Sequence, residues 1–300
     1  MAIYVNTNVS SLTGRNSLNN VQNSLTTTYQ RLSTGMRINS AKDDAAGLQI
    51  ADRLTTQING LNQGNRNASD GIAFAQTAEG AMDEISGMLQ KIRTLAVQAS
   101  TGTNTQDDRL AIDKEATSLM NEITRIAQQT TYGGKTILDG ADKGTKSMYI
   151  NNQGSVGELV LQVGANSGDK IEFNVSNFKF DKLLSATKLT LSAGWNATNK
   201  ALNLSVASGA SDVIRIMDAM IKTTDAQRAD LGAIQNRLES SIRNQSNIAT
   251  NESDARSRIR DADFAEESAN LSQQSIIQQA AASMLMQANT RPQLALSLLG

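Results

Sequence analysis

The chain has 300 residues, a net charge of −1 from 28 basic and 29 acidic residues, 3% aromatic residues, and neither Cys nor His. Without these two residue types there is no thiol nucleophile, no disulfide, and neither the commonest general base nor the commonest metal ligand. The balanced charge gives no basic surface for nucleic acid, and no apolar run approaches the roughly 18 residues of a membrane span.

The N-terminal segment begins MAIYVNTNVSSL, which has neither the basic region nor the continuous apolar stretch of a cleaved secretory signal. We therefore expect the protein to stay inside the cell or to leave it by a route that spares its N-terminus. A narrow apolar stripe at helical spacing follows, formed by Leu18, Val21, Leu25, Tyr29 and Leu32. An isolated helix of this kind is marginally stable in water.

The longest periodic signal predicts a helix over residues 44–99. Its apolar residues step by three and four in alternation, with one slip: Ala51, Leu54, Ile58, Leu61, Asn65, Ala68, Ile72, Ala75, Ala78, Met82, Ile85, Leu89, Ile92, Ala96 and Ala99. A repeat of about 3.5 residues keeps one helix face against a partner helix. Asn65 is either a polar residue that sets the register of that packing or a tolerated gap.

Two more helices and a β-rich segment follow. Residues 107–128 carry inward apolar positions at helical spacing, and a further helix is expected from Ser211, as its N-cap, to Asn251. Short alternating runs between these helices predict strands at 147–151, 158–163, 170–175 and 188–192. The Gly and Asn residues between the runs are typical of hairpin turns.

The C-terminal segment, IQQAAASMLMQANTRPQLALSLL, is unusually apolar for a chain end. Its stripe comprises Ile277, Ala280, Met284, Ala288, Leu294 and Leu298. We expect the two chain ends to pair as helices and to finish folding only against other copies. The predicted fold class is mainly α: a long antiparallel helical coiled coil or rod built from paired N- and C-terminal arms, with a small β-hairpin-rich centre.

Motifs that suggest chemistry are better explained as local structure. Gly133-Gly134-Lys135-Thr136 resembles the end of a phosphate-binding loop, but Gln129 stands where that loop requires its first Gly, after a helix rather than a strand. Residues 139–144 lack the ligand spacing of a calcium loop. Acidic pairs such as Asp43-Asp44 fit helix starts. We therefore predict no catalytic residue, no cofactor and no metal.

Several long stretches closely resemble bacterial flagellins. They are VNTNVSSL (5–12), QRLSTGMRINSAKDDAAGLQIADRL (30–54), ADLGAIQNRLESSI (229–242), ARSRIRDADFAEES (255–268) and the tail MLMQANTRPQLALSLLG. The resemblance covers roughly residues 1–140 and 211–300. It implies a structural protein that self-assembles into the flagellar filament for motility. The alternatives are a hook–filament junction protein and, from another class, a Ser/carboxylate hydrolase on a helical scaffold.

The resemblance also implies a division of the chain. Residues 1–43 and 257–300 would form a terminal coiled-coil domain in the filament core, 44–139 and 211–256 a helical rod, and 140–210 a β-rich centre that is partly surface-exposed. Packing in the filament core is expected from Leu18, Val21, Leu25, Leu32, Ile277, Met284, Leu294 and Leu298. The expected partners are many copies of the chain, the filament cap and the hook-associated proteins, without nucleic acid or membrane.

Export and immune recognition are further implications of the resemblance. Flagellins leave unfolded through the flagellar type III system, to an extracellular location, and a chaperone would bind residues 264–299. A host Toll-like receptor would contact a surface that includes Gln90, Lys91, Leu95 and Glu115. Because Lys91 stands where Arg is usual, we expect weaker recognition by that receptor. A plant receptor kinase would sense residues 30–51, including Gln30, Arg31, Arg37, Lys42, Asp43 and Asp44.

Overall fold

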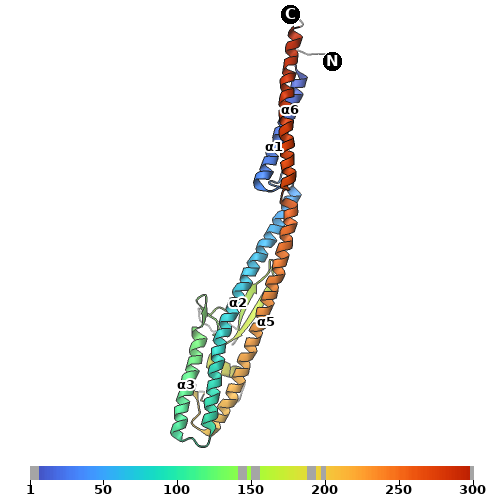
Figure 1. Ribbon diagram of the computed structural model, residues 1–300. Coiled ribbons are helices and arrows are strands. Elements are labelled where there is room, and N and C mark those ends of the chain that lie inside the picture. Colours follow the sequence, from blue (N-terminus) through green and yellow to red (C-terminus); the bar gives the residue numbers. More distant parts are fainter. Residues whose placement is uncertain (1–6, 141–146, 150–155, 188–193, 197–200, 298–300) are drawn as a thin grey trace. The chain divides into compact units, whose positions relative to one another are not determined.

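The computed structural model describes residues 7–140, 147–149, 156–187, 194–196 and 201–297, with the backbone alone from 291. Six helices lie in this part of the chain: α1 (Val9–Thr34), α2 (Ala45–Ser100), α3 (Gln106–Gln129), α4 (Phe180–Ala186), α5 (Ala207–Arg260) and α6 (Phe264–Ser297) (Figure 1). Three antiparallel strand pairs accompany them: β1 (Thr131–Tyr132) with β2 (Lys135–Thr136), β3 (Val156–Gln162) with β4 (Lys170–Ser176), and β5 (Trp195–Asn196) with β6 (Ala201–Leu202). The predicted mainly α fold with a small β-rich centre is confirmed.

The chain divides into two compact units. The terminal unit comprises residues 1–58 and 249–300, and the central unit comprises residues 59–248. Each unit therefore contains segments from both halves of the sequence, as the pairing of N- and C-terminal arms predicts. Helices α2 and α5 contribute residues to both units.

In the terminal unit, α1 lies alongside α6 (Figure 1). The side of α1 that meets α6 has half-buried Leu18, Val21 and Leu32, with Leu25 only 5% exposed. One position differs from the expected stripe: Thr28 is 7% exposed, whereas Tyr29 is 59% exposed. Steps of three and four residues from Leu18 through Leu25 reach Thr28 before Leu32, so the polar residue takes the inner position.

The stripe predicted for the C-terminal helix is not the side that packs on α1. Ile277 and Met284 are exposed, and half-buried Leu271, Ala281 and Leu285 form the inner side instead. A Cβ on Gly14 of α1 would lie 3.2 Å from Cδ1 of Leu285, so the two helices approach closely there. Ile277 and Met284 of the predicted stripe therefore lie outside the contact with α1, whereas Ala288 is half-buried beside it.

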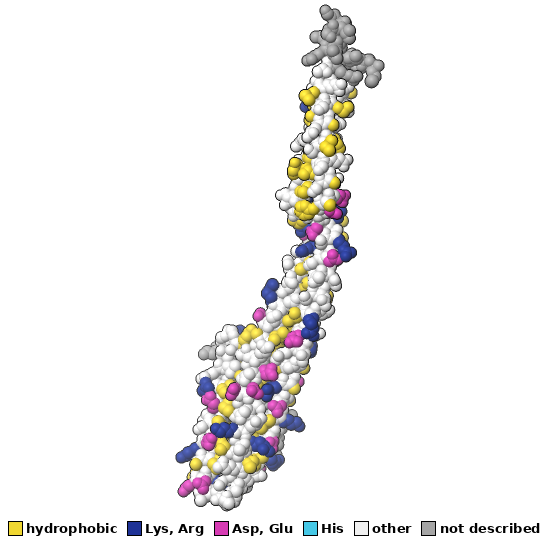
Figure 2. Space-filling model, viewed as in Figure 1, with side chains coloured by type: hydrophobic (Ala, Val, Ile, Leu, Met, Phe, Trp, Pro, Cys, Tyr) yellow, Lys and Arg dark blue, Asp and Glu magenta, His cyan; other side chains and the backbone are white. Residues whose placement is uncertain are grey.

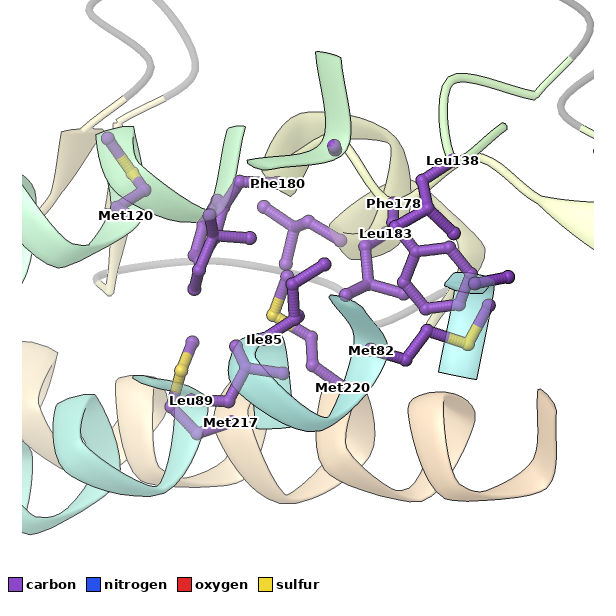
Figure 3. Packing of buried hydrophobic residues seen from close by; sticks show 14 of the residues in the cluster. Met82, Ile85, Leu89, Met120, Leu138, Phe178, Phe180, Leu183, Met217 and Met220 are labelled. Atoms are coloured by element: carbon purple, nitrogen blue, oxygen red, sulfur yellow. The ribbon is translucent and has the colours of Figure 1, made fainter. Parts of the chain in front are cut away.

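The central unit has a continuous hydrophobic core between α2, α3 and α5, covered by α4 and the β3–β4 hairpin. Met82, Ile85 and Leu89 of α2 meet Met217 and Met220 of α5 in this core (Figure 3). Four buried side chains from β4, from α4 and from the segment that joins them close this core: Phe173, Phe178, Phe180 and Leu183. The stripe predicted for α2 is confirmed, because each of its members is buried or half-buried from Ala51 to Ala99.

Side-chain amides fix the β3–β4 hairpin to the long helices. Gln245 Nε2 of α5 donates to the Val163 carbonyl at 2.5 Å, and Asn67 Nδ2 of α2 donates to the Gln162 carbonyl at 2.9 Å. Gln227 accepts from Ser176 N and donates to the Asn174 carbonyl. These polar helix positions serve the hairpin backbone, which would otherwise be buried without partners.

Several local expectations need correction. Helix α5 begins at Ala207, so Ser211 lies inside it and does not cap it. The seven-residue α4 was not predicted. A strand was predicted at 147–151, but in the described residues 147–149 there is only an isolated bridge between Ser147 and Thr136. The strand predicted at 188–192 lies outside the described residues. Asn65 is half-buried on its stripe.

The glycine pair after α3 forms a tight turn. Gly133 and Gly134 have φ angles of 56° and 80° and connect β1 to β2. Two successive positive φ angles are what a two-residue hairpin turn requires. The motif therefore lies in a tight hairpin turn that follows a helix.

Candidate assembly and recognition surfaces

Polar contacts hold α1 and α6 together along their whole overlap. Arg31 and Glu267 form an ion pair of 3.0 Å at one end, and Gln278 Nε2 donates to Gln22 Oε1 at 2.7 Å in the middle. At the other end, Asn8 Nδ2 donates to the Ala288 carbonyl at 2.8 Å. Because the apolar part of this helix pair is narrow, these contacts determine its register more than they stabilise it.

The sides of the terminal helices that lie outside the α1–α6 contact form a broad apolar and exposed face. Its large side chains are Val9, Leu12 and Tyr29 of α1 and Phe264, Ile276, Ile277, Met284 and Met286 of α6. In Figure 2, hydrophobic side chains stand along the helices of this unit among uncharged ones. Single exposed apolar residues are ordinary, but eight large ones on one pair of helices indicate an interaction surface.

A groove of about 780 Å³ lies between α1 and α6 on this unit. Small side chains form much of its wall, because Thr13, Gly14 and Ser17 of α1 lie opposite Ala281 and Ala288 of α6. Val9 and Met284 border it. The groove is therefore open enough to receive apolar side chains from another molecule.

Charged residues are absent from the facing stretches of both terminal helices. Residues 16–30 and residues 268–290 contain no Asp, Glu, Lys or Arg. Solvent-exposed helices normally carry charged residues at about a quarter to a third of their surface. Charge depletion is instead typical of the buried centre of an interface, because burying a charge costs several kcal/mol.

The last turns of α1 and the segment between α1 and α2 hold the residues predicted for plant receptor recognition. Gln30, Arg37, Lys42, Asp43 and Asp44 are exposed, and Arg31 is half-buried by its ion pair with Glu267.

Arg37 fixes the segment, because its Nη2 donates to the Ile259 carbonyl at 2.7 Å and its backbone N donates to the Arg260 carbonyl at 2.7 Å. Asp43 Oδ2 accepts from the backbone N of Ser40 and of Asn39. These hydrogen bonds lower the pKa of Asp43.

The residues predicted for the Toll-like receptor lie on α2 and α3 of the central unit. Gln90, Lys91 and Glu115 are exposed, and Lys91 Nζ lies 3.3 Å from a Glu115 oxygen. Leu95 is 8% exposed and belongs to the core. A molecule that approaches this face would therefore touch the ion pair, and Leu95 would support the helix from inside.

The predicted filament-core residues have different environments. Leu18, Val21, Leu25 and Leu32 form the inner side of α1, whereas Ile277 and Met284 are exposed. Leu294 lies in α6 but its side chain is outside the described part, as is Leu298. Sequence reasoning missed Ile276, Met286 and the Gly14 contact, although the charge-free stretch around the first two was a readable signal.

The described residues include no group of three or more acidic residues placed to hold a metal ion. Within the same ranges, no helix is long and apolar enough to cross a membrane. Burial raises the pKa of Tyr149, whose hydroxyl donates to the Ile137 carbonyl. This pair is a core contact that joins Tyr149 to the segment directly after β2.

These features define a class of protein: a helical structural subunit whose two chain ends form an apolar, uncharged and only partly covered face. The model of the bacterial flagellin N-terminal helical region matches residues 5–143, and that of the C-terminal helical region matches residues 214–299. The chain belongs to the bacterial flagellin family. It is a structural subunit of the bacterial flagellar filament, and neither the junction-protein nor the hydrolase alternative is favoured.

Full-length relatives agree with this assignment, and a solved structure has a similar fold. Flagellin B of Vibrio anguillarum is 35% identical over an alignment 376 positions long, which covers all of both chains. Flagellin A of Vibrio cholerae serotype O1 is 38% identical over 379 aligned residues, again covering both chains completely. A structure described as a flagellar hook-associated protein of Vibrio parahaemolyticus has a TM-score of 0.54 at 14% identity, covering 73% of this chain and all of that one, and shows the fold alone.

Proposed function

We propose that the exposed face of α1 and α6 packs against other copies of the chain and forms the inner layer of the filament. The observation that carries this proposal is the combination of exposed Ile276, Ile277, Met284 and Met286 with a stretch of α6 that has no charge. Such a face would lose water on assembly without burying an unpaired ion. Residues 1–43 and 257–300 would then form the terminal domain, and 44–139 with 211–256 the rod around a centre of 140–210.

Substitution of two exposed residues tests this packing. In Ile276→Gln/Met284→Gln, two apolar side chains become polar where the single molecule has little contact, so the helix content of the monomer should be unchanged. Elongation of filament seeds by this variant should fall at least tenfold, measured by light scattering. Val206→Gln, at an exposed apolar position outside the terminal unit, is the control and should elongate normally. Wild-type elongation by the double variant would contradict the proposal.

A truncation tests the last turns of α6. Deleting residues 293–300 should leave the central unit folded by circular dichroism and stop polymerisation, because the apolar tail would no longer reach a neighbouring copy. Normal filaments from this truncated chain would show that the tail is not part of the packing.

We also propose that the protein reaches the filament through the flagellar type III system, unfolded and extracellular in destination, with a chaperone on residues 264–299. The support is chemical: the chain lacks Cys and so cannot form a cross-link that would block a narrow channel. The exposed apolar side of α6 also requires protection before assembly. With the chaperone present, a chain that ends at residue 263 should be exported less than the full-length chain. Equal export of the two chains would refute the assignment of the chaperone site to residues 264–299.

Two recognition surfaces remain proposals. The face with Gln90, Lys91 and Glu115 would bind a host Toll-like receptor, and the segment with Arg37 and Lys42 would bind a plant receptor kinase. Their support is exposure in the single molecule. Lys91→Ala should lower Toll-like receptor signalling by monomer in a reporter cell, whereas Lys114→Ala, an exposed lysine on α3, should not. An equal response to both variants would remove Lys91 from the surface.

A further inference from the structure

The methionines of this chain fall into distinct environments. Met82, Met120, Met217 and Met220 are buried in the core of the central unit. Met36, Met88 and Met148 are half-buried. In contrast, Met284 is 70% exposed and Met286 is 66% exposed, and both lie on α6 of the terminal unit. The two thioethers most accessible to solvent in the described chain are therefore two residues apart on one helix.

Their surroundings make a change in polarity costly. Met284 borders the groove between α1 and α6, whose wall also includes Val9, Ala281 and Ala288. The neighbouring sequence has no charged residue between 268 and 290. A methionine sulfoxide would place a strong hydrogen-bond acceptor on this face, and burial of an acceptor without a donor is unfavourable.

We propose that Met284 and Met286 form an oxidation-sensitive modification site that controls whether a free subunit can assemble. This inference rests on the proposed packing of the α1–α6 face against other copies. The reactant is a peroxide: the methionine sulfur supplies an electron pair to one peroxide oxygen and becomes the sulfoxide, the O–O bond breaks, and hydrogen peroxide is reduced to water. Sulfur is oxidised by two electrons, and the atoms balance as thioether plus H₂O₂ to sulfoxide plus H₂O.

The site is open in the free subunit and closed in the polymer. A free subunit exposes both sulfur atoms to solvent, so peroxide reaches them directly. Once neighbouring copies cover the face, the same atoms lose access to the oxidant. Oxidation therefore acts before incorporation, and subunits already in a filament are protected. The modification is reversible in principle, because methionine sulfoxide is reducible back to methionine by the two stereospecific reductases.

Peptide mass spectrometry after a short hydrogen peroxide treatment of the full chain provides the first test. We expect Met284 and Met286 to oxidise at least tenfold faster than Met82, Met217 and Met220 in the monomer. In seeded filaments, both rates should fall by at least fivefold. Equal oxidation of exposed and core methionines in the monomer, or equal rates before and after assembly, would overturn the proposal.

Elongation of filament seeds provides the second test, with each protein's treated rate divided by its own untreated rate. We expect this ratio to fall below about one fifth for wild type and to stay near one for Met284→Leu/Met286→Leu, since Leu and Met have similar volumes. Met36→Leu/Met88→Leu/Met148→Leu, which removes the half-buried thioethers, should remain as sensitive as wild type. If the ratio falls as far for Met284→Leu/Met286→Leu as it does for wild type, the proposal is overturned.

Two readouts separate this proposal from the proposed function. If untreated wild type does not elongate seeds, the packing proposal fails, while the oxidation rates of the monomer still report on the site. If the Met284→Leu/Met286→Leu protein itself does not elongate seeds, a second measurement tests the proposal. Peroxide-treated wild type is incubated with both methionine sulfoxide reductases, and its elongation rate is measured again. Recovery of elongation supports the proposal, and no recovery after mass spectrometry shows full reduction of both residues contradicts it.

Discussion

At the scale of single residues, the glycines of α2 have two opposite environments. A Cβ on Gly80 or Gly87 would meet no atom within 4 Å. A Cβ on Gly64 would overlap the backbone carbonyl of Val163, where the hairpin turn approaches the helix. Gly lowers the stability of a helix because its backbone loses more entropy on folding. Of these three residues, only Gly64 offsets that cost, because the close approach of the hairpin leaves no room for a side chain.

Alanine substitutions at these glycines should therefore have opposite signs. Gly80→Ala and Gly87→Ala should each raise the free energy of unfolding by about 0.5–1 kcal/mol, because the helix gains propensity at no steric cost. Gly64→Ala should lower it, because the hairpin must shift. Urea unfolding of the monomer measures all three variants, and a stabilised Gly64→Ala would show that the hairpin is not held against α2.

The inner side of α1 gives a second comparison between neighbouring residues. Leu25→Ala removes a buried side chain and should destabilise the terminal unit by about 2–5 kcal/mol, toward the lower end because the helix pair is narrow. Tyr29→Ala, four positions along the helix, should change the stability of the monomer by less than about 0.5 kcal/mol because its ring is exposed. Thermal unfolding of the α1–α6 pair, followed by circular dichroism, measures the difference.

Sequence periodicity identified Leu25 correctly but placed Tyr29 rather than Thr28 on the inner side. Steps of three and four residues allow both positions at that turn, and hydrophobicity favours Tyr29. The aromatic ring is left free for another molecule, so the error arises from reading one apolar face where the helix has two.

At the scale of elements, α3 has the most complete start signal in the chain. Thr105 Oγ1 accepts from the Asp108 backbone N at 3.3 Å, and Asp108 Oδ2 accepts from the Thr105 backbone N at 3.0 Å. This reciprocal pair is a capping box. Hydrogen bonds from the Thr105 hydroxyl, and then from its backbone, lower the pKa of Asp108 below the usual 3.8.

The lowered pKa determines how the cap responds to acid. A carboxyl group with a depressed folded-state pKa contributes stability above its unfolded pKa, and this contribution is lost as the pH falls through the folded-state value. Asp108→Asn should therefore be less stable than wild type at pH 7, and the difference should shrink below pH 3.8. Unfolding curves of both proteins between pH 7 and pH 2 measure it; a difference that does not change with pH would exclude the carboxylate as its source.

Long elements were predictable from sequence and short ones were not. The stripe from Ala51 to Ala99 repeats often enough to define α2, and the alternation in β3 and β4 defines their hairpin. Helix α4 has only seven residues, about two turns, so it offers no periodicity to read. The start of α5 was placed at Ser211 because Ser is a good N-cap, but burial of Ala210 in the core draws the helix further toward the N-terminus.

At the scale of the whole molecule, the two units differ in what holds them together. The central unit encloses a core with many fully buried side chains, whereas the terminal unit relies on a narrow inner side and a few polar contacts. Amide protection against exchange follows local stability. Backbone amides of α1 and α6 in the monomer should therefore exchange much faster than those of α2 and α5 within the central unit.

Assembly should change this pattern. When the exposed face is covered, exchange in α1 and α6 should slow by at least tenfold, while exchange in the core of the central unit should change little. Hydrogen–deuterium exchange of monomer and filament, read by mass spectrometry, measures both. Slow exchange of α1 and α6 already in the monomer would mean that the chain ends are complete without other copies.

The uncharged stretch from Ser268 to Thr290 has a consequence for how the filament responds to its surroundings. No side chain in that stretch titrates, so the contact it makes has no pH dependence of its own, and ordinary salt has no charge there to screen. Sulfate and similar salts, which strengthen the burial of apolar surface, act on it instead. If this stretch packs against other copies as proposed, the strength of that contact would depend on the kind of salt present and not on screening of charge.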